Sequence, residues 1–205
     1  MPKSPNRVAR GRPPLGPQAR ATERRRIGAL AEGLFREEGF ESVSLRRLAA
    51  VAGCTPMTLY AYFDNKADIL REIWSRMLQE LFAELEGQAA AQTDPRQLLL
   101  TLSHHYVRYW LDHPDRYRMI FMTPGVTQGD VGVFVGDGQS TRRFALFSDA
   151  IARSIADPEP ARVKLVGETL VCGLHGIAHN HITISRYPWE DASGHVETLV
   201  RALTR

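Results

Sequence analysis

The fold is decided by the stretch Ser44-Leu-Arg-Arg-Leu-Ala-Ala-Val-Ala-Gly-Cys-Thr-Pro-Met-Thr-Leu-Tyr-Ala-Tyr-Phe63, which predicts two short helices joined by a tight turn. Gly53 falls in the turn, where a positive φ costs least for a residue without a Cβ. Thr55 then offers a side-chain oxygen for an N-cap, and Pro56 stands at the first helical position, which together are a strong start signal for the second helix. The pattern predicts a helix-turn-helix.

The second helix of this pair has an apolar face and a polar face. Leu59 and Phe63, four residues apart, are expected to face inward, as are Leu48 and Ala49 of the first helix. The other side chains would face outward, where a recognition helix presents them to a DNA major groove: Thr55, Met57, Thr58, Tyr60 and Ala61. A helix pair that carries this pattern by chance, with no role in DNA binding, is the alternative at this point.

The composition is that of an ordinary globular protein. No apolar run approaches the length that crosses a bilayer, and no apolar stretch follows the basic N-terminus as it would in a secretory signal. We therefore expect a cytoplasmic protein with no membrane association. Cys54 and Cys172 stand in apolar contexts, so each is predicted to be a buried thiol rather than half of a disulfide.

Positive charge is concentrated at the N-terminus. The chain carries a net charge of +3, but residues 1–26 hold eight Lys or Arg against Glu23 alone, a net +7, so the remaining 179 residues carry −4. Such a split predicts a polyanion-binding end joined to a body without that role. Residues 1–19, rich in Pro, Gly and Arg, are predicted to form a disordered arm.

Within the arm, the segment Arg10-Gly-Arg-Pro13 matches the core of the AT-hook, in which extended arginines flank a glycine thin enough for a narrow minor groove. Under this interpretation Arg10 and Arg12 contact DNA. A solvated basic tail that follows the phosphates is the equal alternative, and either one would add affinity beside the main contact.

Amphipathic helices are predicted on both sides of the helix-turn-helix. Before it, apolar residues at helical spacing predict a helix over about residues 22–38, which Gly39 ends. After it, Asn65 is the expected N-cap of a long helix that reaches about Gly87, and Asp68 completes a capping-box-like pair. A long helix would thus connect a small N-terminal domain to the rest of the chain.

The N-terminal domain contains a specific set of residues, namely Ala31 and Phe35 before Gly39, the segment Ser44-x-x-x-Leu48-Ala49, Gly53, and the string Thr58-Leu59-Tyr60-x-x-Phe63-x-Asn65-Lys66-x-x-x-Leu70. With the basic arm and the long exit helix, this set resembles the tetracycline-repressor (TetR) family of bacterial regulators. The resemblance covers roughly residues 20–70. It implies an all-α fold in four parts: a basic arm over 1–19, a helix-turn-helix DNA-binding domain over 20–66, a connecting helix over 67–87, and a ligand-binding and dimerisation domain over 88–205.

The resemblance also implies which side chains contact an operator in double-stranded DNA. In the family, the counterparts of the recognition-helix residues touch bases or phosphates, and the counterparts of Ser44, Tyr62 and Lys66 reach the DNA backbone. Lys66, at the start of a helix, could add its charge to backbone amides at a phosphate. The expected DNA-binding residues are Ser44, Arg46, Thr55, Pro56, Met57, Thr58, Tyr60, Tyr62 and Lys66, with Arg10 and Arg12 of the arm.

Beyond the connecting helix, apolar periodicity predicts helices over residues 94–112, 117–122, 144–155, 163–182 and 191–203. Residues 123–140 hold five glycines and are predicted to be a flexible loop, with helix in part as the alternative. The helix over 163–182 contains Gly167, Gly173 and Gly176, each of which costs roughly 1 kcal/mol relative to alanine. Three glycines in one helix indicate close approach by another helix or by a ligand.

The C-terminal part resembles the variable domain of one TetR subgroup, the WHG type, through His175-Gly176 and the upstream segment His113-Pro-Asp-Arg-Tyr-Arg-Met119. In the family the last two helices pair with their mates across a two-fold axis, which implies a homodimer through residues 161–185 and 191–203. A small apolar effector among the helices of this domain is also implied, with core packing as the equal alternative for each residue. The candidate pocket residues are His105, Tyr106, Tyr109, Trp110, Phe121, Met122, Phe144, Phe147, Leu174, His175 and Ala178.

Two other classes of protein are alternatives. A metal sensor or enzyme could use His175, His179 and His181, although only the first two share the spacing of a metal pair, so we expect no metal and no cofactor. We find no Gly-x-Ser-x-Gly, no His-Glu-x-x-His and no nucleotide-binding loop, so we expect no enzymatic activity.

An architectural DNA-binding protein, bound through its basic arm, is the second alternative. The main prediction is a transcriptional regulator, a homodimeric repressor released from a palindromic operator by a small apolar effector.

Overall fold

The computed structural model describes residues 16–90, 92–123 and 139–205, with the backbone alone for 139–143. All regular structure within these ranges is helical, which confirms the all-α fold class. The chain divides into two compact units, Met1–Glu72 and Ile73–Arg205. No helix of the described ranges is long and apolar enough to cross a membrane.

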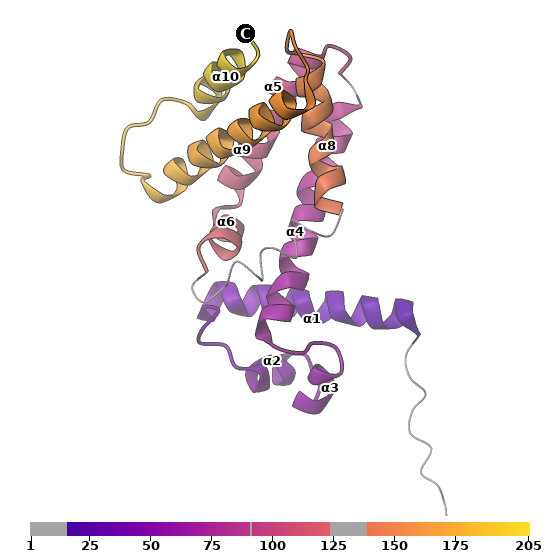
Figure 1. Ribbon diagram of the computed structural model, residues 1–205. Helices are drawn as coiled ribbons and strands as arrows, with labels where there is room; N and C mark the ends of the chain where they lie inside the picture. Colours follow the sequence, from indigo (N-terminus) through magenta and orange to yellow (C-terminus); the bar gives the residue numbers. More distant parts are fainter. Residues whose placement is uncertain (1–15, 91, 124–138) are drawn as a thin grey trace, which may run out of the picture. The chain divides into compact units, whose positions relative to one another are not determined.

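The N-terminal unit consists of three helices and the start of a fourth (Figure 1). These are α1 (Pro17–Glu38), α2 (Leu45–Val51), α3 (Pro56–Tyr60) and the first turns of α4 (Lys66–Ala89). Helix α1 begins at Pro17, so the last three residues of the predicted arm are helical rather than disordered. The predicted AT-hook segment lies outside the described residues.

The core of the N-terminal unit confirms the inward face predicted for the helix-turn-helix. Leu48 of α2, Leu59 of α3 and Phe63 beyond it are each no more than 1% exposed. The same unit buries an apolar stripe of α1 and the first turn of α4, formed by Ile27, Ala31, Leu34, Phe35, Ile69 and Leu70. Apolar periodicity alone was sufficient to predict this arrangement.

Hydrogen bonds cap the starts of α2 and α4, and the cap at Asn65 was predicted. The Ser44 hydroxyl accepts from the N–H of Arg47 at 3.1 Å, and the Asn65 amide oxygen accepts from the N–H of Asp68 at 2.9 Å. Gly53, in the turn between α2 and α3, has φ of +69°. Each bond satisfies an N–H group that a helix N-terminus leaves without a partner, which is why these residue types define the helix boundaries.

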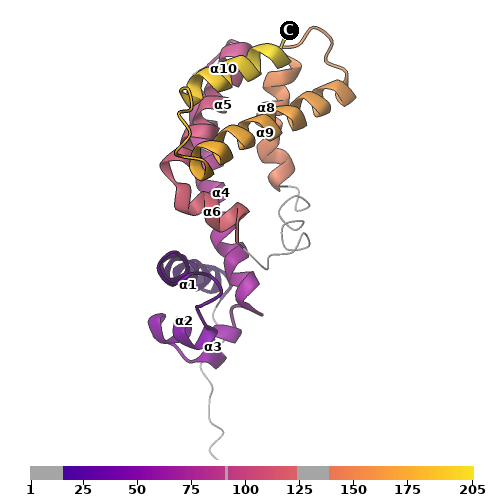
Figure 2. The ribbon, with the colours of Figure 1, turned by 90° about the vertical axis from the view of Figure 1, so that its left-hand side faces the viewer.

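The C-terminal unit is a helical bundle built around α5 (Pro95–Asp112) and α9 (Pro160–Thr183) (Figures 1 and 2). Helix α5 packs against α8 (Gln139–Ala152), α9 and α10 (Ala192–Leu203), and α9 packs against α8 and α10. The short helix α6 (Pro114–Phe121) begins three residues before the predicted start at 117, because Pro114 suits a first helical position. Most of the predicted 123–140 loop lies outside the described residues.

The glycines of α9 differ in what surrounds them. A Cβ added to Gly173 would lie 2.4 Å from Cδ2 of Leu199, so α10 approaches α9 closely there. A Cβ at Gly167 would make an ordinary contact, and one at Gly176 would meet nothing within 4 Å. The close approach predicted for this helix is therefore confirmed at one glycine.

The prediction of buried thiols was wrong for Cys172. Its side chain is exposed on the open side of α9, where it lines a groove shared with α8. Cys54 is partly buried, and both thiols are free. Leu170 and Leu174, two residues away on either side, lie on the buried face of α9, which explains the misleading context.

Candidate nucleic-acid interface

Helix α3 presents its outer face to solvent. Met57 is 80% exposed and Tyr60 52% exposed, whereas Leu59, between them in sequence, is 1% exposed. Thr55, Pro56 and Thr58 are exposed as well. A large apolar and a large aromatic side chain held outward on a capped helix suit contact with base edges and thymine methyl groups.

The N-terminal end of α3 is ordered by a pair of hydroxyls. The Thr55 hydroxyl accepts from the N–H of Thr58 at 3.1 Å, which confirms the predicted N-cap, and the two hydroxyl oxygens lie 3.0 Å apart. Recognition helices contact base edges mainly with their N-terminal residues. The cap therefore fixes the part of α3 that would enter a groove.

Helix α2 contributes exposed polar groups at its start. Ser44 and Arg46 are both exposed, in agreement with the positions that a DNA contact needs. Arg47, the next residue, pairs instead with Glu38 at the end of α1, at 2.9 Å. Arg47 is thus held by α1, whereas the Arg46 side chain stays exposed.

Lys66 has a different environment from the one predicted. Its ammonium donates to the carbonyl oxygens of Phe40 at 2.6 Å, Glu41 at 3.2 Å and Val43 at 3.3 Å, and lies 4.3 Å from the centroid of the Phe40 ring. These bonds use all three N–H donors of the side chain. A phosphate contact would require the ammonium to leave these carbonyls, so the structure gives Lys66 a role in holding the α1–α2 connection.

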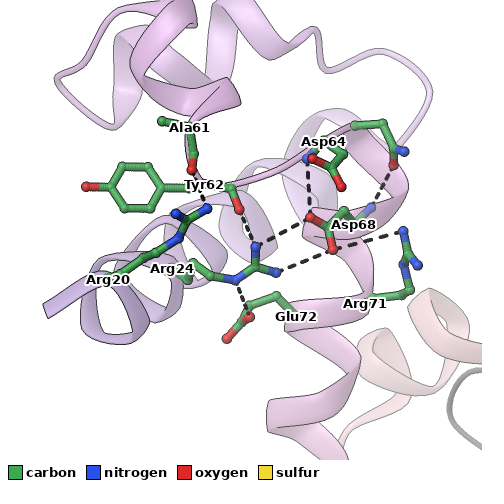
Figure 3. Close-up of polar contacts among 9 residues, drawn as sticks. Arg20, Arg24, Ala61, Tyr62, Asp64, Asp68, Arg71 and Glu72 are labelled. Atoms are coloured by element: carbon green, nitrogen blue, oxygen red, sulfur yellow. Dashed lines mark hydrogen bonds and ion pairs between the residues drawn. The ribbon is translucent and has the colours of Figure 1, made fainter. Parts of the chain in front are cut away.

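Two arginines near the start of α1 donate to backbone carbonyl groups of the same unit (Figure 3). The Arg20 guanidinium donates to the carbonyl oxygen of Ala61 at 2.6 Å, and the Arg24 guanidinium donates to that of Tyr62. Both carbonyls lie at the C-terminal end of α3. The Tyr62 side chain, another predicted DNA contact, is half-buried.

Arg24 also pairs with two carboxylates of α4. Its guanidinium lies 3.3 Å from Asp68 and 3.2 Å from Glu72. Burial lowers the pKa of Arg24, but hydrogen bonds and charges from the two carboxylates outweigh burial and raise the pKa above its ordinary value. The guanidinium is therefore held as a charged group inside the N-terminal unit.

Arg26 makes a comparable contact with α2. It donates to the carbonyl oxygen of Ala52, the C-cap of α2, at 2.9 Å, and pairs with Glu23 at 2.6 Å. Charge counting had assigned Arg20, Arg24 and Arg26 to a polyanion-binding end. Their partners lie 26 to 48 positions away in the chain, except for Glu23, so no sequence pattern could have identified them.

The predicted pocket residues do not share one cavity. Six of them belong to the buried core of the C-terminal unit: Tyr106, Tyr109, Trp110, Phe147, Leu174 and Ala178. His105 pairs with Glu84 at 2.8 Å and lines a polar groove beside α10. Met122 is exposed just beyond α6.

One cluster of predicted residues does come together. The Phe121 ring packs edge-on against Trp110, with ring centroids 5.3 Å apart, and against His175, with centroids 4.4 Å apart. The buried Tyr117, which was not among the predicted pocket residues, lies within this cluster. Phe121 is partly exposed, so the cluster reaches the surface of the unit.

A second candidate place for an apolar ligand is the groove between α8 and α9. Its volume is about 700 Å³ and most of its lining is apolar. Phe144 and Phe147 on α8 face Val163 and Val171 on α9 across this groove. The structure thus divides the predicted pocket among separate locations.

The three histidines of α9 do not converge. His175 and His179 both lie next to the Tyr117 hydroxyl, at 2.8 Å and 3.0 Å. His181 instead packs beside Trp189 and His195, with ring centroids 5.8 Å and 5.7 Å away. Within the described ranges, no three His, Cys, Asp or Glu side chains come together as metal ligands would. The geometry therefore does not support the metal-based alternative.

The helix-turn-helix lies in a region that the chain shares with known proteins. A family model described as bacterial regulatory proteins, tetR family, matches residues 27–73, which include the whole helix-turn-helix. Over these residues the chain has the DNA-binding domain of the tetR family. The resemblance stated from the sequence is thereby confirmed, and the WHG subgroup stays a prediction.

Curated relatives match the TetR-family N-terminal region. The chain is 35% identical over 83 residues to the HTH-type transcriptional regulator AcrR of Shigella flexneri, a match that covers 40% of this chain and 39% of that protein. It is 33% identical over 73 residues to the HTH-type transcriptional repressor KstR2 of Rhodococcus jostii, covering 36% of each chain. The matches span less than half of these relatives.

Solved structures extend the likeness to the whole fold. The regulatory protein SCO4313 superposes with a TM-score of 0.70 at 20% identity, over 93% of this chain and 98% of that chain. The transcriptional regulator FadR from Bacillus subtilis, in complex with stearoyl-CoA, gives 0.67 at 13% identity, over 87% and 96%. At such identities, these neighbours show a shared fold alone.

Proposed function

We propose that this TetR-family protein is a homodimeric transcriptional repressor that binds a palindromic operator. The observation that carries the proposal is the outer face of α3, where Met57 and Tyr60 are exposed over the buried Leu59. Two such helices, one per subunit, would occupy successive major grooves about 34–36 Å apart. Such regulators bind and release DNA, and the proposal involves no catalysis.

The proposed DNA contacts are divided by what they supply. Thr55, Pro56, Met57, Thr58 and Tyr60 on α3, with Arg46 on α2, would distinguish bases. Ser44 and Tyr62 would contact the DNA backbone. The cations of the arm, including Arg10 and Arg12, would add affinity that is independent of sequence.

Dimerisation is proposed through residues 161–185 and 191–203. The open side of α9 carries Leu165, which is 63% exposed, and Cys172. Ile184 and Tyr187, just beyond α9, are 50% and 57% exposed. Large exposed apolar side chains on and just beyond one helix are typical of a surface that a second subunit covers.

A small apolar effector is proposed to bind the C-terminal unit. The supporting observations are the apolar groove between α8 and α9 and the aromatic cluster around Phe121. An effector would release DNA if it bound more tightly to a form of the dimer in which the spacing of the two N-terminal units does not match the operator. A ligand shifts a conformational equilibrium only by the difference between its affinities for the two forms. A protein with this function acts where genomic DNA is, in the bacterial cytoplasm.

The proposal is tested by selecting DNA with the purified full-length protein. A library of duplexes with a randomised core should yield an enriched palindrome, and sedimentation should show two copies of the chain per duplex. Enrichment of no sequence, or binding by single subunits, would overturn the proposal. An architectural DNA-binding protein would bind every duplex with similar affinity.

A further inference from the structure

Helix α3 is too short to be stable without contacts to the rest of the N-terminal unit. It spans five residues, and isolated helices shorter than about 12 residues are marginal in water. Its N-terminus has the Thr55 cap, and its inner face has Leu59. The C-terminal end is different, because the carbonyl groups of Ala61 and Tyr62 lie beyond the last bonds of α3 and need donors from elsewhere.

Two arginines of α1 supply these donors. Arg20 donates to the carbonyl of Ala61, and Arg24 donates to the carbonyl of Tyr62, directly after Tyr60 (Figure 3). Cations at a helix C-terminus also interact favourably with the helix dipole. The end of α3 that leaves the proposed groove is thus attached to α1.

Arg24 is tied at the same time to the start of α4. Figure 3 shows its guanidinium between the Tyr62 carbonyl and the carboxylates of Asp68 and Glu72. Asp68 in turn accepts from the backbone N–H of Asp64 at 3.3 Å, in the connection between α3 and α4. The side chains of Arg24, Asp68 and Glu72 are 26%, 20% and 23% exposed, so the contacts are largely shielded from solvent.

We propose that Arg24 is a positioning residue for operator recognition, which fixes the orientation of α3 relative to α1 and α4 without itself contacting DNA. This inference rests on the proposed function. Without Arg24, the N-cap and the buried apolar residues would still form α3, but its C-terminal end would move. Base contacts depend on that orientation, whereas contacts from flexible cations to phosphates do not.

The test compares two arginines that are adjacent in sequence. Arg24→Met removes the network, and Arg25→Met removes the same charge from an exposed position on α1. Full-length variants are titrated with the duplex that the wild-type protein selects and with a scrambled duplex of equal length, at several salt concentrations. Thermal unfolding is followed for each variant.

We expect Arg24→Met to lower affinity for the selected duplex about tenfold, the loss of one good base contact. Its affinity for the scrambled duplex and its salt slope should match those of Arg25→Met. Arg24→Lys should remain impaired, because an ammonium cannot reproduce the planar fork that holds three partners. The proposal would be overturned if the ratio of the affinities for the selected and the scrambled duplex did not change. It would also be overturned if the affinities for both duplexes fell equally and the salt slope fell by about one.

A carboxylate variant decides the matter if Arg24→Met does not fold. Glu72→Gln removes a negative charge and leaves every cation in place, so electrostatics alone would raise affinity for both duplexes. The proposal instead requires preference for the selected duplex to fall, by about threefold for the loss of one of several partners. Equal gains on both duplexes would overturn it. If the wild-type protein selects no sequence, the proposed function fails first and this inference fails with it.

Discussion

The Tyr117 hydroxyl lies 2.8 Å from Nε2 of His175, inside the C-terminal unit, where the tyrosine side chain is fully buried. The same oxygen lies 3.0 Å from Nδ1 of His179. Burial raises the pKa of Tyr117 to about 12, so the phenol keeps its hydrogen. With both imidazoles neutral, the phenol donates to one ring and accepts from the other, and the arrangement is satisfied without charge.

The stability of this unit should therefore decrease in mild acid. Burial, followed by the charge of His179, lowers the pKa of His175 below its ordinary value. The unfolded chain then binds the proton first as the pH falls below about 6.5, so the free energy of unfolding decreases from there downward and is fully retained above it. The free energy of unfolding is measured by chemical denaturation at several pH values between about 5 and 8, a range that brackets the ordinary imidazole pKa.

Replacement of His175 by Gln should flatten that pH dependence. Burial and the charge of His195 lower the pKa of His181, so His181 would account for part of the pH dependence that remains in this variant. His104→Gln is the control, because this half-exposed residue lies on another face of the unit. Equal pH dependence in both variants would contradict the assignment.

Tyr60→Ala should impair operator recognition without destabilising the protein. The side chain is 52% exposed, so we expect stability to change by less than about 0.5 kcal/mol, while binding to the selected duplex weakens by about 1–3 kcal/mol. Leu59→Ala, at a buried position, should instead lower stability by about 2–5 kcal/mol. Denaturation curves and DNA footprinting separate the two effects. An unchanged footprint for Tyr60→Ala would show that α3 does not recognise the operator.

Lys66→Met should weaken the N-terminal unit more than it weakens phosphate binding. The variant loses three bonds to carbonyl oxygens, which predicts a loss of about 1.5–3 kcal/mol in the free energy of unfolding. Arg25→Met serves as the control for loss of charge. If stability is unchanged but the salt slope of DNA binding falls by about one, Lys66 contacts a phosphate as the family resemblance implied.

Gly173→Ala should destabilise the C-terminal unit. The new methyl group would meet Leu199 at 2.4 Å, which predicts an overpacking cost of about 1–3 kcal/mol, offset in part by the better helix propensity of alanine. Gly176→Ala meets no atom within 4 Å and should gain up to about 1 kcal/mol. Thermal unfolding at a fixed protein concentration ranks the two variants, and a more stable Gly173→Ala would contradict the observed packing.

Deletion of residues 1–15 should weaken DNA binding but leave site preference intact. The deletion removes Lys3, Arg7, Arg10 and Arg12 and stops before α1, which begins at Pro17. The salt slope should fall by up to about 4, because each phosphate contact adds about 0.9. Complete loss of binding would favour the architectural alternative.

The sequence predicted the helices well because their signals are local. Proline and hydroxyl or amide side chains mark the starts at Thr55 and Asn65, and a positive φ marks the turn at Gly53. Core positions such as Leu59 followed from spacing alone. These features depend on neighbours within four residues, which a single sequence displays.

The partners of the charged side chains could not be predicted in this way. Arg24 and Glu72 are 48 positions apart, and the contact of Lys66 with Phe40 spans 26. Both contacts depend on how α1 crosses the later helices. The pocket prediction was diffuse for the same reason, because periodicity identifies the apolar face of α5 but not the helix that covers it.

The network around Arg24 has a practical consequence for hybrid regulators that combine one N-terminal domain with another effector-binding body. A splice after residue 66, where the DNA-binding domain was predicted to end, would give Arg24 carboxylate partners from a foreign helix or none. A splice after Glu72, where the two compact units divide, transfers the arginine with both of its acids. The portable module therefore includes the first two turns of α4.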